Sequence, residues 1–551
     1  MEEIQAALTR VIQEVFKVDV QPVLTRPDEQ FGDYATNVAL QLAGKVGKPP
    51  RDIATQLVEK VSAALPDHVE AVAIAGPGFL NFRLKDQTLL HMLTVRPAKT
   101  LVGQKVVVEL SSPNPFKDFH IGHVYNNVVG EALANLQEAG GATVHRVSYH
   151  GDVGMHIAMA IWGLQNKTGG NPQKMEAVPE EDRPRFLGEA YALGANAYKD
   201  DAAVQQDIKA INAKIYDASD ATVNAFYNTG RSWSFAYFDT IYVKLGSSIE
   251  KKYFESDAGP RGLGIVREHL ADGVFENSDG AVVYKGEKAG LHTRVFINKQ
   301  GLPTYEAKDL GLTMLKWEDY HYDRSIIVTA NEINEYFKVV LAALGEIDQG
   351  LAAKTAHLSH GVVKLTTGKM SSRTGQVLSA VQVLEMVRQA VQETTNGDAK
   401  TLDDSAIGAI KYAFLKQRVG GDIIFDIQES VALEGNRGPY LQYAHARARS
   451  ILAKAGEHKS DAMTTLEPGE RSLARKISEY PAVTQLAVAE LMPHHICTYL
   501  YELAQTFNRF YEHNRVVGDP REGVRVQLVA QYAVVLKDGL HLLGIAAPEH
   551  M

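Results

Sequence analysis

The stretch E-L-S-S-P-N-P-F-K-D-F-H-I-G-H, from Glu109 to His123, decides the fold. It begins at the end of K-V-V-V-E-L (105–110), a β-branched run typical of a buried parallel strand, and continues through a proline-interrupted loop. Residues 124–139 then have helical periodicity and end at two glycines, before a second strand pattern at 142–149. We therefore predict a strand–loop–helix–strand unit of a parallel sheet.

Two histidines, His120 and His123, stand where the predicted helix begins. In a parallel sheet, ligands bind beyond the carboxyl ends of the strands, where a helix N-terminus offers free N–H groups and the positive end of its dipole to phosphate. Two imidazoles in the first turn of such a helix predict an anion site. The motif alone leaves open the alternative of a structural histidine pair at a helix start.

The tetrapeptide H-I-G-H resembles the first signature of class I aminoacyl-tRNA synthetases, and S-S-P-N followed by K-D-F resembles the arginyl-tRNA synthetase branch. The second class I signature, K-M-S-K-S, resembles K-M-S-S-R from Lys369, where Ser372 replaces the second lysine. In arginyl enzymes a lysine just upstream of the first signature is thought to take its place, and Lys117 stands there. The resemblance implies an ATP site made of His120, Ile121, Gly122, His123, Lys117, Val363, Lys369, Met370, Ser371 and Ser372.

A second motif, T-Y-E-A-K-D (304–309), opens a helical pattern and places Tyr305 and Asp309 on one helix face. In the family, Tyr and Asp at this spacing bind the guanidinium and amine of arginine. Two carboxylates from distant parts of the chain suit a planar, permanently charged guanidinium. The arginine-binding residues implied are Glu109, Ser111, Asn114, His123, Tyr305 and Asp309. The family's usual glutamine is missing from N-E-I-N-E-Y (331–336), which leaves two alternatives: Glu332 or Asn334 substitutes for it, or the contact is absent.

The 551 residues are too many for one hydrophobic core, so about three domains are expected. The formal charge of −9 argues against indiscriminate nucleic-acid binding, although a basic stripe on an acidic body remains compatible with it. A single cysteine, Cys497, excludes an intrachain disulfide and a cysteine-based zinc cluster. No apolar run approaches the ~18 residues of a membrane span, and the start M-E-E lacks a leader pattern, so we expect a cytoplasmic protein with no membrane association.

The expected fold class is multidomain α/β, with a split Rossmann-type catalytic domain that carries an insertion. We expect an N-terminal α+β domain at 1–95, the catalytic domain at 96–400 with its insertion at about 166–290, and an α-helical bundle at 401–551. The second half of the fold is expected to resume near 294–297. Other expected elements are helices at 3–18, 33–46, 50–65, 331–344, 406–417, 439–455, 470–488, 493–512 and 523–543, and strands at 70–75, 79–84 and 325–330.

The two ends of the chain resemble the tRNA-contacting domains of the family. F-G-D-Y-A-T-N-V-A-L (31–40) resembles its N-terminal domain, which touches the outer corner of the tRNA, and the helical end resembles its anticodon-binding domain. Interleaved aromatic and basic groups suit splayed single-stranded bases. The tRNA-binding candidates are Phe31, Asn37, Arg437, Tyr440, Tyr443 and Arg447. The open alternative is that the tyrosines pack the bundle and the arginines are solvated.

The resemblance implies an arginine–tRNA ligase that uses ATP with Mg²⁺ and no zinc, binds arginine and tRNA(Arg), and is a monomer. The arginine carboxylate would attack the α-phosphorus of ATP, and the 2′-hydroxyl of the terminal adenosine of the tRNA would then take the arginyl group. The implied catalytic residues are His120, Gly122, His123, Lys117 and Lys369. Three alternatives remain: a class I synthetase for another amino acid, an H-x-G-H nucleotidyltransferase that makes a small cofactor, and a non-catalytic RNA-binding paralogue.

Overall fold

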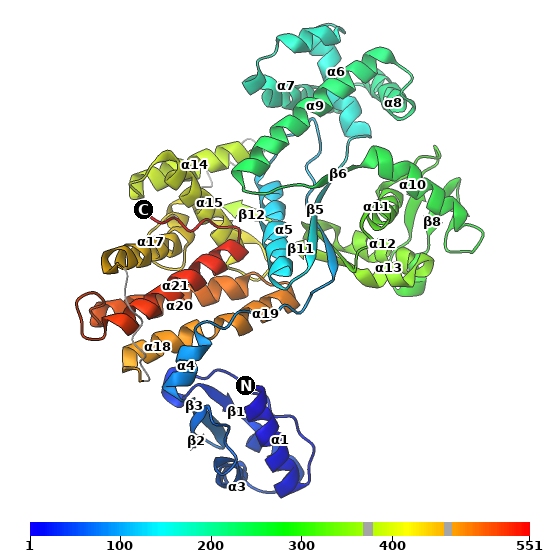
Figure 1. The fold of residues 1–551 in the computed structure, drawn as a ribbon. Helices are drawn as coiled ribbons and strands as arrows, with labels where there is room; N and C mark the ends of the chain where they lie inside the picture. The colour runs from blue at the N-terminus through cyan, green and yellow to red at the C-terminus, as the bar shows by residue number, and fades with distance from the viewer. Residues whose placement is uncertain (367–377, 457–464) are drawn as a thin grey trace. The chain divides into compact units, whose positions relative to one another are not determined.

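The computed structural model describes residues 1–366, 378–456 and 465–551, and the chain divides into two compact units (Figure 1). The first unit consists of Met1–Arg96, Arg447–Ala482 and Tyr501–Leu536. The second consists of Pro97–Ala446, Val483–Leu500 and Lys537–Met551.

A five-stranded parallel sheet of order β11-β10-β4-β5-β6 organises the second unit. The predicted strand–loop–helix–strand unit is confirmed as β4 (Lys105–Ser111), α5 (Ile121–Ala139) and β5 (Thr143–His150). From β4 the chain runs to β5 and β6 on one side, and only later to β10 and β11 on the other. The order therefore reverses at β4, and the loop after β4 lies at the point where such sheets bind ligands. The other strands are β6 (Lys251–Phe254), β10 (Arg324–Ala330) and β11 (Thr355–His360).

Helices cover this sheet. The helix α5 packs against β4, β5 and β10, because its apolar residues from Val124 to Leu136 are almost all buried. The helix α11 packs against β4, and α12 and α13 pack against β11. The strand predicted at 325–330 and the helix predicted to follow it are confirmed as β10 and α12. The bounds of these helices are α11 (Tyr305–Tyr320), α12 (Asn334–Ile347) and α13 (Gln349–Lys354).

Residues 294–297, where we expect the second half of the fold to resume, form a strand outside the five-stranded sheet. The strand β6, which lies inside the range expected for the insertion, already pairs with β5. Residues 294–297 form β9 in a separate antiparallel sheet of order β7-β8-β9. The sequence of β6, K-K-Y-F, is too short for periodicity to reveal a strand, and its two lysines are too polar. The elements concerned are α10 (Glu255–Glu268), β7 (Glu276–Ser278), β8 (Ala281–Tyr284), η4 (Gly286–Ala289) and β9 (Arg294–Ile297).

The remaining part of the expected insertion is helical and has its own core. Phe226, Ile161 and Leu187 belong to this core, and Phe116 from the loop after β4 joins it. The loop that precedes the histidine pair is therefore anchored in the insertion. The elements are α6 (Met155–Thr168), η2 (Pro172–Ala177), η3 (Glu180–Asp182), α7 (Arg183–Asp200), α8 (Ala202–Asp217) and α9 (Ala221–Lys244).

The first unit begins with a three-stranded antiparallel sheet and its helices. The predicted strand pair is confirmed as β2 and β3, but the helix predicted from residue 33 begins only at Val38. Residues 34–36 instead pair with β3 as strand β1, and the Asp33 carboxylate accepts a hydrogen bond from the Leu84 backbone N–H at 2.7 Å. The elements are α1 (Glu2–Phe16), η1 (Glu29–Phe31), β1 (Tyr34–Thr36), α2 (Val38–Val46), α3 (Pro50–Ser62), β2 (Val69–Ala75), β3 (Phe79–Leu84) and α4 (Asp86–Met92).

The C-terminal region is mostly helical, as predicted, but the helix predicted at 470–488 is two helices. The chain leaves the first helix at Ser478, whose hydroxyl donates to the Arg475 carbonyl at 2.6 Å. The elements not yet named are η5 (Asn331–Ile333), β12 (Val363–Leu365), α14 (Ala380–Thr394), α15 (Ala399–Leu415), β13 (Ile423–Phe425), α16 (Ile427–Ser430), α17 (Gly438–Ala455), α18 (Pro468–Ile477), α19 (Tyr480–Glu490), α20 (His494–His513) and α21 (Glu522–Leu542).

A buried ionic network connects α18 to the N-terminal sheet within the first unit. Arg471 donates to the Asp33 carboxylate at 2.6 Å and also pairs with Asp86. Arg471 and Asp33 are 7% and 1% exposed, so both charges are removed from water and depend on each other for compensation.

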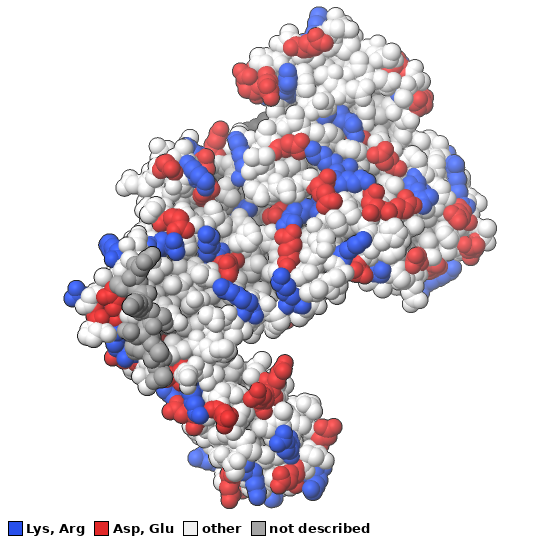
Figure 2. Space-filling view, in the orientation of Figure 1, with Lys and Arg blue, Asp and Glu red and all other residues white. Residues whose placement is uncertain are grey.

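The surface carries both signs of charge. On the face shown in Figure 2, lysine and arginine side chains are interspersed with aspartate and glutamate. Among the helices of the described residues, none combines the length and the apolar character that a membrane span requires.

Candidate active site

Glu109 is a buried acid at the carboxyl end of the central strand β4. Its side chain is 4% exposed and accepts a hydrogen bond at 3.1 Å from Lys316, whose side chain is 0% exposed. Lys316 lies two turns after Asp309 in α11, so the two residues share one stripe of that helix. A buried carboxylate of this kind is tolerated only with a partner, and Lys316 supplies that partner.

Asp309 lies beside Glu109, and both carboxylates line one small cavity with the apolar side chains of Ile327 and Phe337. The Tyr336 hydroxyl donates a hydrogen bond to Asp309. Burial raises the pKa of Asp309 to about 7, and Glu109 and Glu255 make smaller contributions in the same direction. The cavity measures ≈ 10 Å³, about the space that one water molecule needs. The two acids predicted from separate halves of the sheet are therefore brought together.

The Tyr149 hydroxyl, at the end of β5, is buried close to these acids and has no hydrogen-bond partner. Burial raises the pKa of Tyr149 well above its ordinary value, and Asp309, Glu255 and Glu109 raise it further. An unpaired buried hydroxyl costs free energy, so a native structure that keeps one calls for an explanation. Tyr149 does not line the small cavity, so a ligand would reach its hydroxyl only after that cavity opens.

His120 and His123 cap the N-terminus of α5 and stack on each other, with ring centroids 3.7 Å apart. His120 Nδ1 accepts from the Gly122 backbone N–H at 3.1 Å, and His123 Nδ1 accepts from the His120 backbone N–H at 3.3 Å. Each neutral ring must then carry its proton on Nε2. Burial lowers the pKa of both histidines, and Lys117 lowers both further. Two neutral Nε2–H donors at a helix N-terminus are suited to phosphate oxygens.

Gly122 lies tightly against the His120 ring. A Cβ on Gly122 would stand 3.0 Å from His120 Cε1, closer than most side chains approach. A side chain at this position would therefore require the His120 ring to shift by a few tenths of an ångström from its capping position. Ile121, the next residue of the predicted ATP set, is 6% exposed and packs in the core.

Lys117 is positioned by a strained residue. Phe116, directly before it, has φ 65°, a left-handed conformation that costs free energy in a side chain of this size. The Ser234 hydroxyl accepts from the Phe116 backbone N–H at 2.9 Å and so holds this conformation from helix α9. The Lys117 ammonium then lies 4.7 Å from the centre of the Tyr191 ring, on α7.

A second, larger cavity of ≈ 510 Å³ brings together Asn114, Lys117 and Tyr305 from the predicted sites. Tyr305 is 60% exposed and does not line the small cavity of Glu109 and Asp309, although it shares helix α11 with Asp309. Lys308, which lines the larger cavity, forms a buried ion pair of 2.6 Å with Glu255, and Glu255 in turn raises the pKa of Asp309.

The G-D-V-G turn after β5 forms hydrogen bonds with the loop after β4 and with two helices. Asp152 is fully buried and accepts from the Tyr227 hydroxyl at 2.9 Å and from both the backbone and the hydroxyl of Ser256. These partners belong to α9 and α10, so Asp152 connects the insertion to the sheet. The neighbouring His150 donates from Nδ1 to the Pro113 carbonyl at 2.7 Å, and Gly151 N–H donates to Asn114 Oδ1 at 3.1 Å. Both bonds shape the loop after β4. Ser111, the last residue of β4, is buried.

The second signature falls mainly on residues 367–377, so Lys369, Met370, Ser371 and Ser372 lie outside the described residues. The chain on its carboxyl side is described, and Leu378 and Ala380 form backbone hydrogen bonds with Ile121 and Phe119 at 3.3 and 2.7 Å. On its amino side, Val363 in β12 pairs in parallel with Ile423 in β13. The segment after 377 therefore lies directly beside the first histidine.

The six residues predicted to touch tRNA differ in their surroundings. Phe31 is 48% exposed, and Asn37, also exposed, accepts from Gln41 at 2.8 Å. Arg437 donates to the Glu434 carbonyl at 2.7 Å and pairs with Glu429 at 3.0 Å. Along α17, Tyr440 is half-buried and Tyr443 is 41% exposed. The guanidinium of Arg447 lies 4.8 Å from the centre of the Tyr511 ring.

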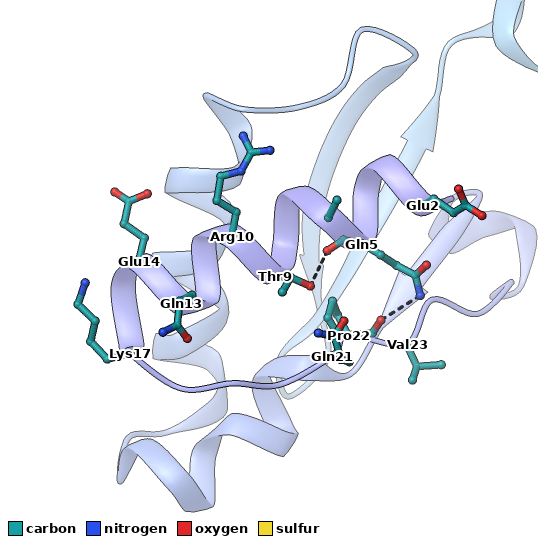
Figure 3. A pocket seen from close by; sticks show the side chains of 11 residues that line it. Glu2, Gln5, Thr9, Arg10, Gln13, Glu14, Lys17, Gln21, Pro22 and Val23 are labelled. Carbon is teal, nitrogen blue, oxygen red and sulfur yellow. Dashed lines mark hydrogen bonds between the residues drawn. The ribbon is translucent and has the colours of Figure 1, made fainter.

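A groove of ≈ 910 Å³ along α1 in the first unit contains no comparable chemistry (Figure 3). Its side chains are mostly amides and single charges, and two of them donate to backbone carbonyls. Gln5 donates to the Pro22 carbonyl at 3.1 Å, and Thr9 donates to the Gln5 carbonyl at 2.9 Å.

Sequence reasoning missed Lys316, Tyr336 and Tyr149. The spacing of Lys316, seven residues after Asp309 on a helix, is a signal that helical periodicity contains. Tyr336 and Tyr149 come from separate elements and carry no such signal, because only the folded sheet brings them to the acids.

Comparison with known proteins gives matches along the whole chain. Three family models match: an arginyl-tRNA synthetase N-terminal domain over residues 2–84, the catalytic domain of class I (R) tRNA synthetases over 86–427, and a DALR anticodon-binding domain over 441–551. The arginine–tRNA ligase of Bacteroides thetaiotaomicron is 30% identical over 98% of this chain and 97% of its own length. That of Frankia casuarinae is 31% identical over 100% and 97%. The solved Thermus thermophilus arginyl-tRNA synthetase covers both chains fully, with a TM-score of 0.81 and 26% identity.

Proposed function

Because this chain belongs to the arginyl-tRNA synthetase family, we propose that the residues described above activate arginine and pass it to tRNA. The chain is a class I arginine–tRNA ligase, which forms arginyl-adenylate from arginine and ATP and transfers the arginyl group to the 2′-hydroxyl of the terminal adenosine of tRNA(Arg). Diphosphate leaves in the first step and AMP in the second. The proposal concerns which side chains do this.

The observation that carries the proposal is the shared cavity of Glu109 and Asp309. Lys316 compensates Glu109, but the described residues that line this cavity give Asp309 no cationic partner of its own, and a guanidinium presents parallel N–H groups that match carboxylate oxygens. The unpaired Tyr149 hydroxyl supports the same assignment, since it would gain a partner from the ligand. A cavity of ≈ 10 Å³ cannot hold a guanidinium, so arginine must open it on binding.

The larger cavity would hold the α-amino and carboxylate groups of arginine. Asn114 and Tyr305 line that cavity, and Glu255 and Lys308 join it to the guanidinium site. Ser111 and His123, at the strand end and the helix start, would complete the contacts of the substrate. This chain lacks the glutamine that the family usually has near the start of α12. Glu332 and Asn334 are the candidates for the corresponding contact with arginine.

The histidine pair would bind the phosphates of ATP. A carboxylate is already a nucleophile, so the first step needs alignment and stabilisation of developing charge rather than a strong base. His120 and His123 offer Nε2–H donors, while Lys117 and Lys369 would neutralise the outer phosphates. Gly122, Ile121 and Val363, with Met370, Ser371 and Ser372, would complete the nucleotide site. Magnesium would be bound only as the counter-ion of the triphosphate.

The proposal extends to the rest of the molecule. Residues 1–95 and 401–551 would be the tRNA-binding domains on either side of the catalytic domain at 96–400, with its insertion at about 166–290. The contacts to tRNA would come from Phe31, Asn37, Arg437, Tyr440, Tyr443 and Arg447, and exposed Tyr443 is the best placed of these to stack on a base. The enzyme would act as a cytoplasmic monomer.

The test is ATP–pyrophosphate exchange with each amino acid in turn, with and without tRNA. We expect exchange with arginine alone and, because the family usually needs tRNA to activate its amino acid, only when tRNA is present. Exchange driven by another amino acid would contradict the guanidinium assignment.

A further inference from the structure

The buried pair of Lys316 and Glu109 has a geometry that a purely structural ion pair does not require. Lys316 contacts Glu109 at Oε2, and Glu109 lines the cavity that also receives Asp309. The pair thus stands at the wall of the guanidinium site and not in a remote part of the core.

We propose that Lys316 is the positioning residue of the guanidinium site: it holds Glu109 by Oε2 and leaves Oε1 as the acceptor for arginine. This inference rests on the proposed function and adds to it a residue that acts on the substrate through Glu109. The carboxylate that must receive a planar donor is thereby fixed in rotamer before the substrate arrives, which lowers the entropic cost of binding.

Charge balance supports this role. Glu109 and Lys316 together are neutral, and Asp309 contributes one acid when ionised. One guanidinium therefore completes a neutral set of two anions and two cations in a dry cavity. Without Lys316, one guanidinium would face two acids, and the uncompensated charge of Glu109 would disfavour the ionised form of Asp309.

The ionisable groups that face the two acids come from every element around the cavity. Tyr336 and Lys316 favour the ionised form of Asp309, whereas burial, Glu109 and Glu255 oppose it. The ionisable side chains at and around the two acids are Glu109 on β4, Tyr149 on β5, Asp152 in the turn after it, Glu255 on α10, Lys308, Asp309 and Lys316 on α11, and Tyr336 on α12.

The first experiment measures tRNA-dependent ATP–pyrophosphate exchange in Lys316→Met, Lys316→Arg and the control Arg146→Met. Arg146 forms a comparable, mostly buried ion pair with Glu131 at 3.0 Å between α5 and β5, away from both cavities. For Lys316→Met we expect the KM for arginine to rise about tenfold near neutral pH, with the KM for ATP unchanged. The acidic limb of kcat/KM for arginine should move up by about one pH unit, and the loss should recover at about pH 9. Lys316→Arg should restore most of the wild-type profile.

The second experiment removes both partners, which keeps the test decisive even where Lys316→Met does not fold. Glu109→Gln alone leaves a buried lysine beside the incoming guanidinium, whereas Glu109→Gln with Lys316→Met leaves a neutral pair that the fold tolerates. The KM for arginine should therefore be at least about threefold lower in the double variant than in Glu109→Gln.

The outcomes separate the two claims. A wild-type enzyme that shows no arginine-dependent exchange contradicts the guanidinium site and the role of Lys316 with it. If the wild-type enzyme does show arginine-dependent exchange, three results contradict the role of Lys316 alone: Lys316→Met keeps the wild-type KM and pH profile, it raises the KM for arginine and for ATP equally, or the double variant binds arginine no better than Glu109→Gln. Arg146→Met should keep the wild-type KM for both substrates.

Discussion

The Tyr336 hydroxyl donates its hydrogen bond to Asp309, the acid that helix α11 places beside Glu109. The bond favours the ionised carboxylate, yet burial outweighs it and leaves the pKa of Asp309 at about 7. The acid therefore changes its charge within the physiological range, and a bound guanidinium would draw off its proton.

The first prediction is a pH dependence that follows from this raised pKa. Because arginine needs the ionised acid, its KM should rise by up to about tenfold per unit as the pH falls below about 7, and level off above it. The pKa of Asp309 is above its unfolded value, so the free protein should lose stability as the pH rises from about 4 to about 7. Asp309→Asn should abolish that loss in thermal unfolding. An arginine KM that is flat across this range contradicts the assignment.

The second prediction separates function from stability at Tyr149. Its hydroxyl is unpaired in the free protein, so Tyr149→Phe should leave the melting temperature unchanged or raise it slightly. The same substitution should raise the KM for arginine about tenfold, because the ligand loses a hydrogen-bond partner. Tyr336→Phe is the matched comparison: it removes a hydroxyl that is already bonded to Asp309, and should lower stability as well. A destabilised Tyr149→Phe with normal arginine binding would reverse our interpretation of this hydroxyl.

The third prediction concerns Lys117, which a left-handed Phe116 presents to the larger cavity. Lys117→Ala should lower the turnover of ATP–pyrophosphate exchange by about 10²- to 10³-fold, with little change in arginine binding. Lys167 is a matched control, because its ammonium also lies 4.7 Å from an aromatic ring, that of Phe186, within the helical insertion. Lys167→Ala should exchange at the wild-type rate. Wild-type turnover in Lys117→Ala would remove this residue from the phosphate site.

The fourth prediction tests the ionic network of the first unit. Arg471→Met removes the nearer of the two arginines that pair with buried Asp33, leaving only Arg475 at 3.6 Å, and should cost up to about 3–5 kcal/mol in the unfolding of this unit. Adding Asp33→Asn removes the poorly compensated charge, so the double variant should be more stable than Arg471→Met. Differential scanning calorimetry of the three proteins gives the comparison, and a double variant that is less stable would contradict the role of the pair.

Local patterns in the sequence predicted the centre of the molecule well. The strand, loop and helix from Lys105 to Ala139 were predictable because each has a strong period and a clear boundary. Strand β6 was missed because four residues with two lysines carry no period, and β1 because its three residues run directly into a helix. Glu109 and Asp309 were predicted as a pair from the resemblance to the family, and the fold places both at one small cavity. Their partners Tyr149, Tyr336 and Lys316 depend on the sheet order, which no local pattern contains.

The central claim is that Glu109 and Asp309 bind the same guanidinium. The direct measurement is the KM for arginine and for ATP in tRNA-dependent ATP–pyrophosphate exchange, for Glu109→Gln and Asp309→Asn. We predict that each variant raises the KM for arginine by about 10²-fold or more, while the KM for ATP stays within about threefold of wild type. Equal increases for the two substrates, or an unchanged KM for arginine in either variant, would contradict the claim.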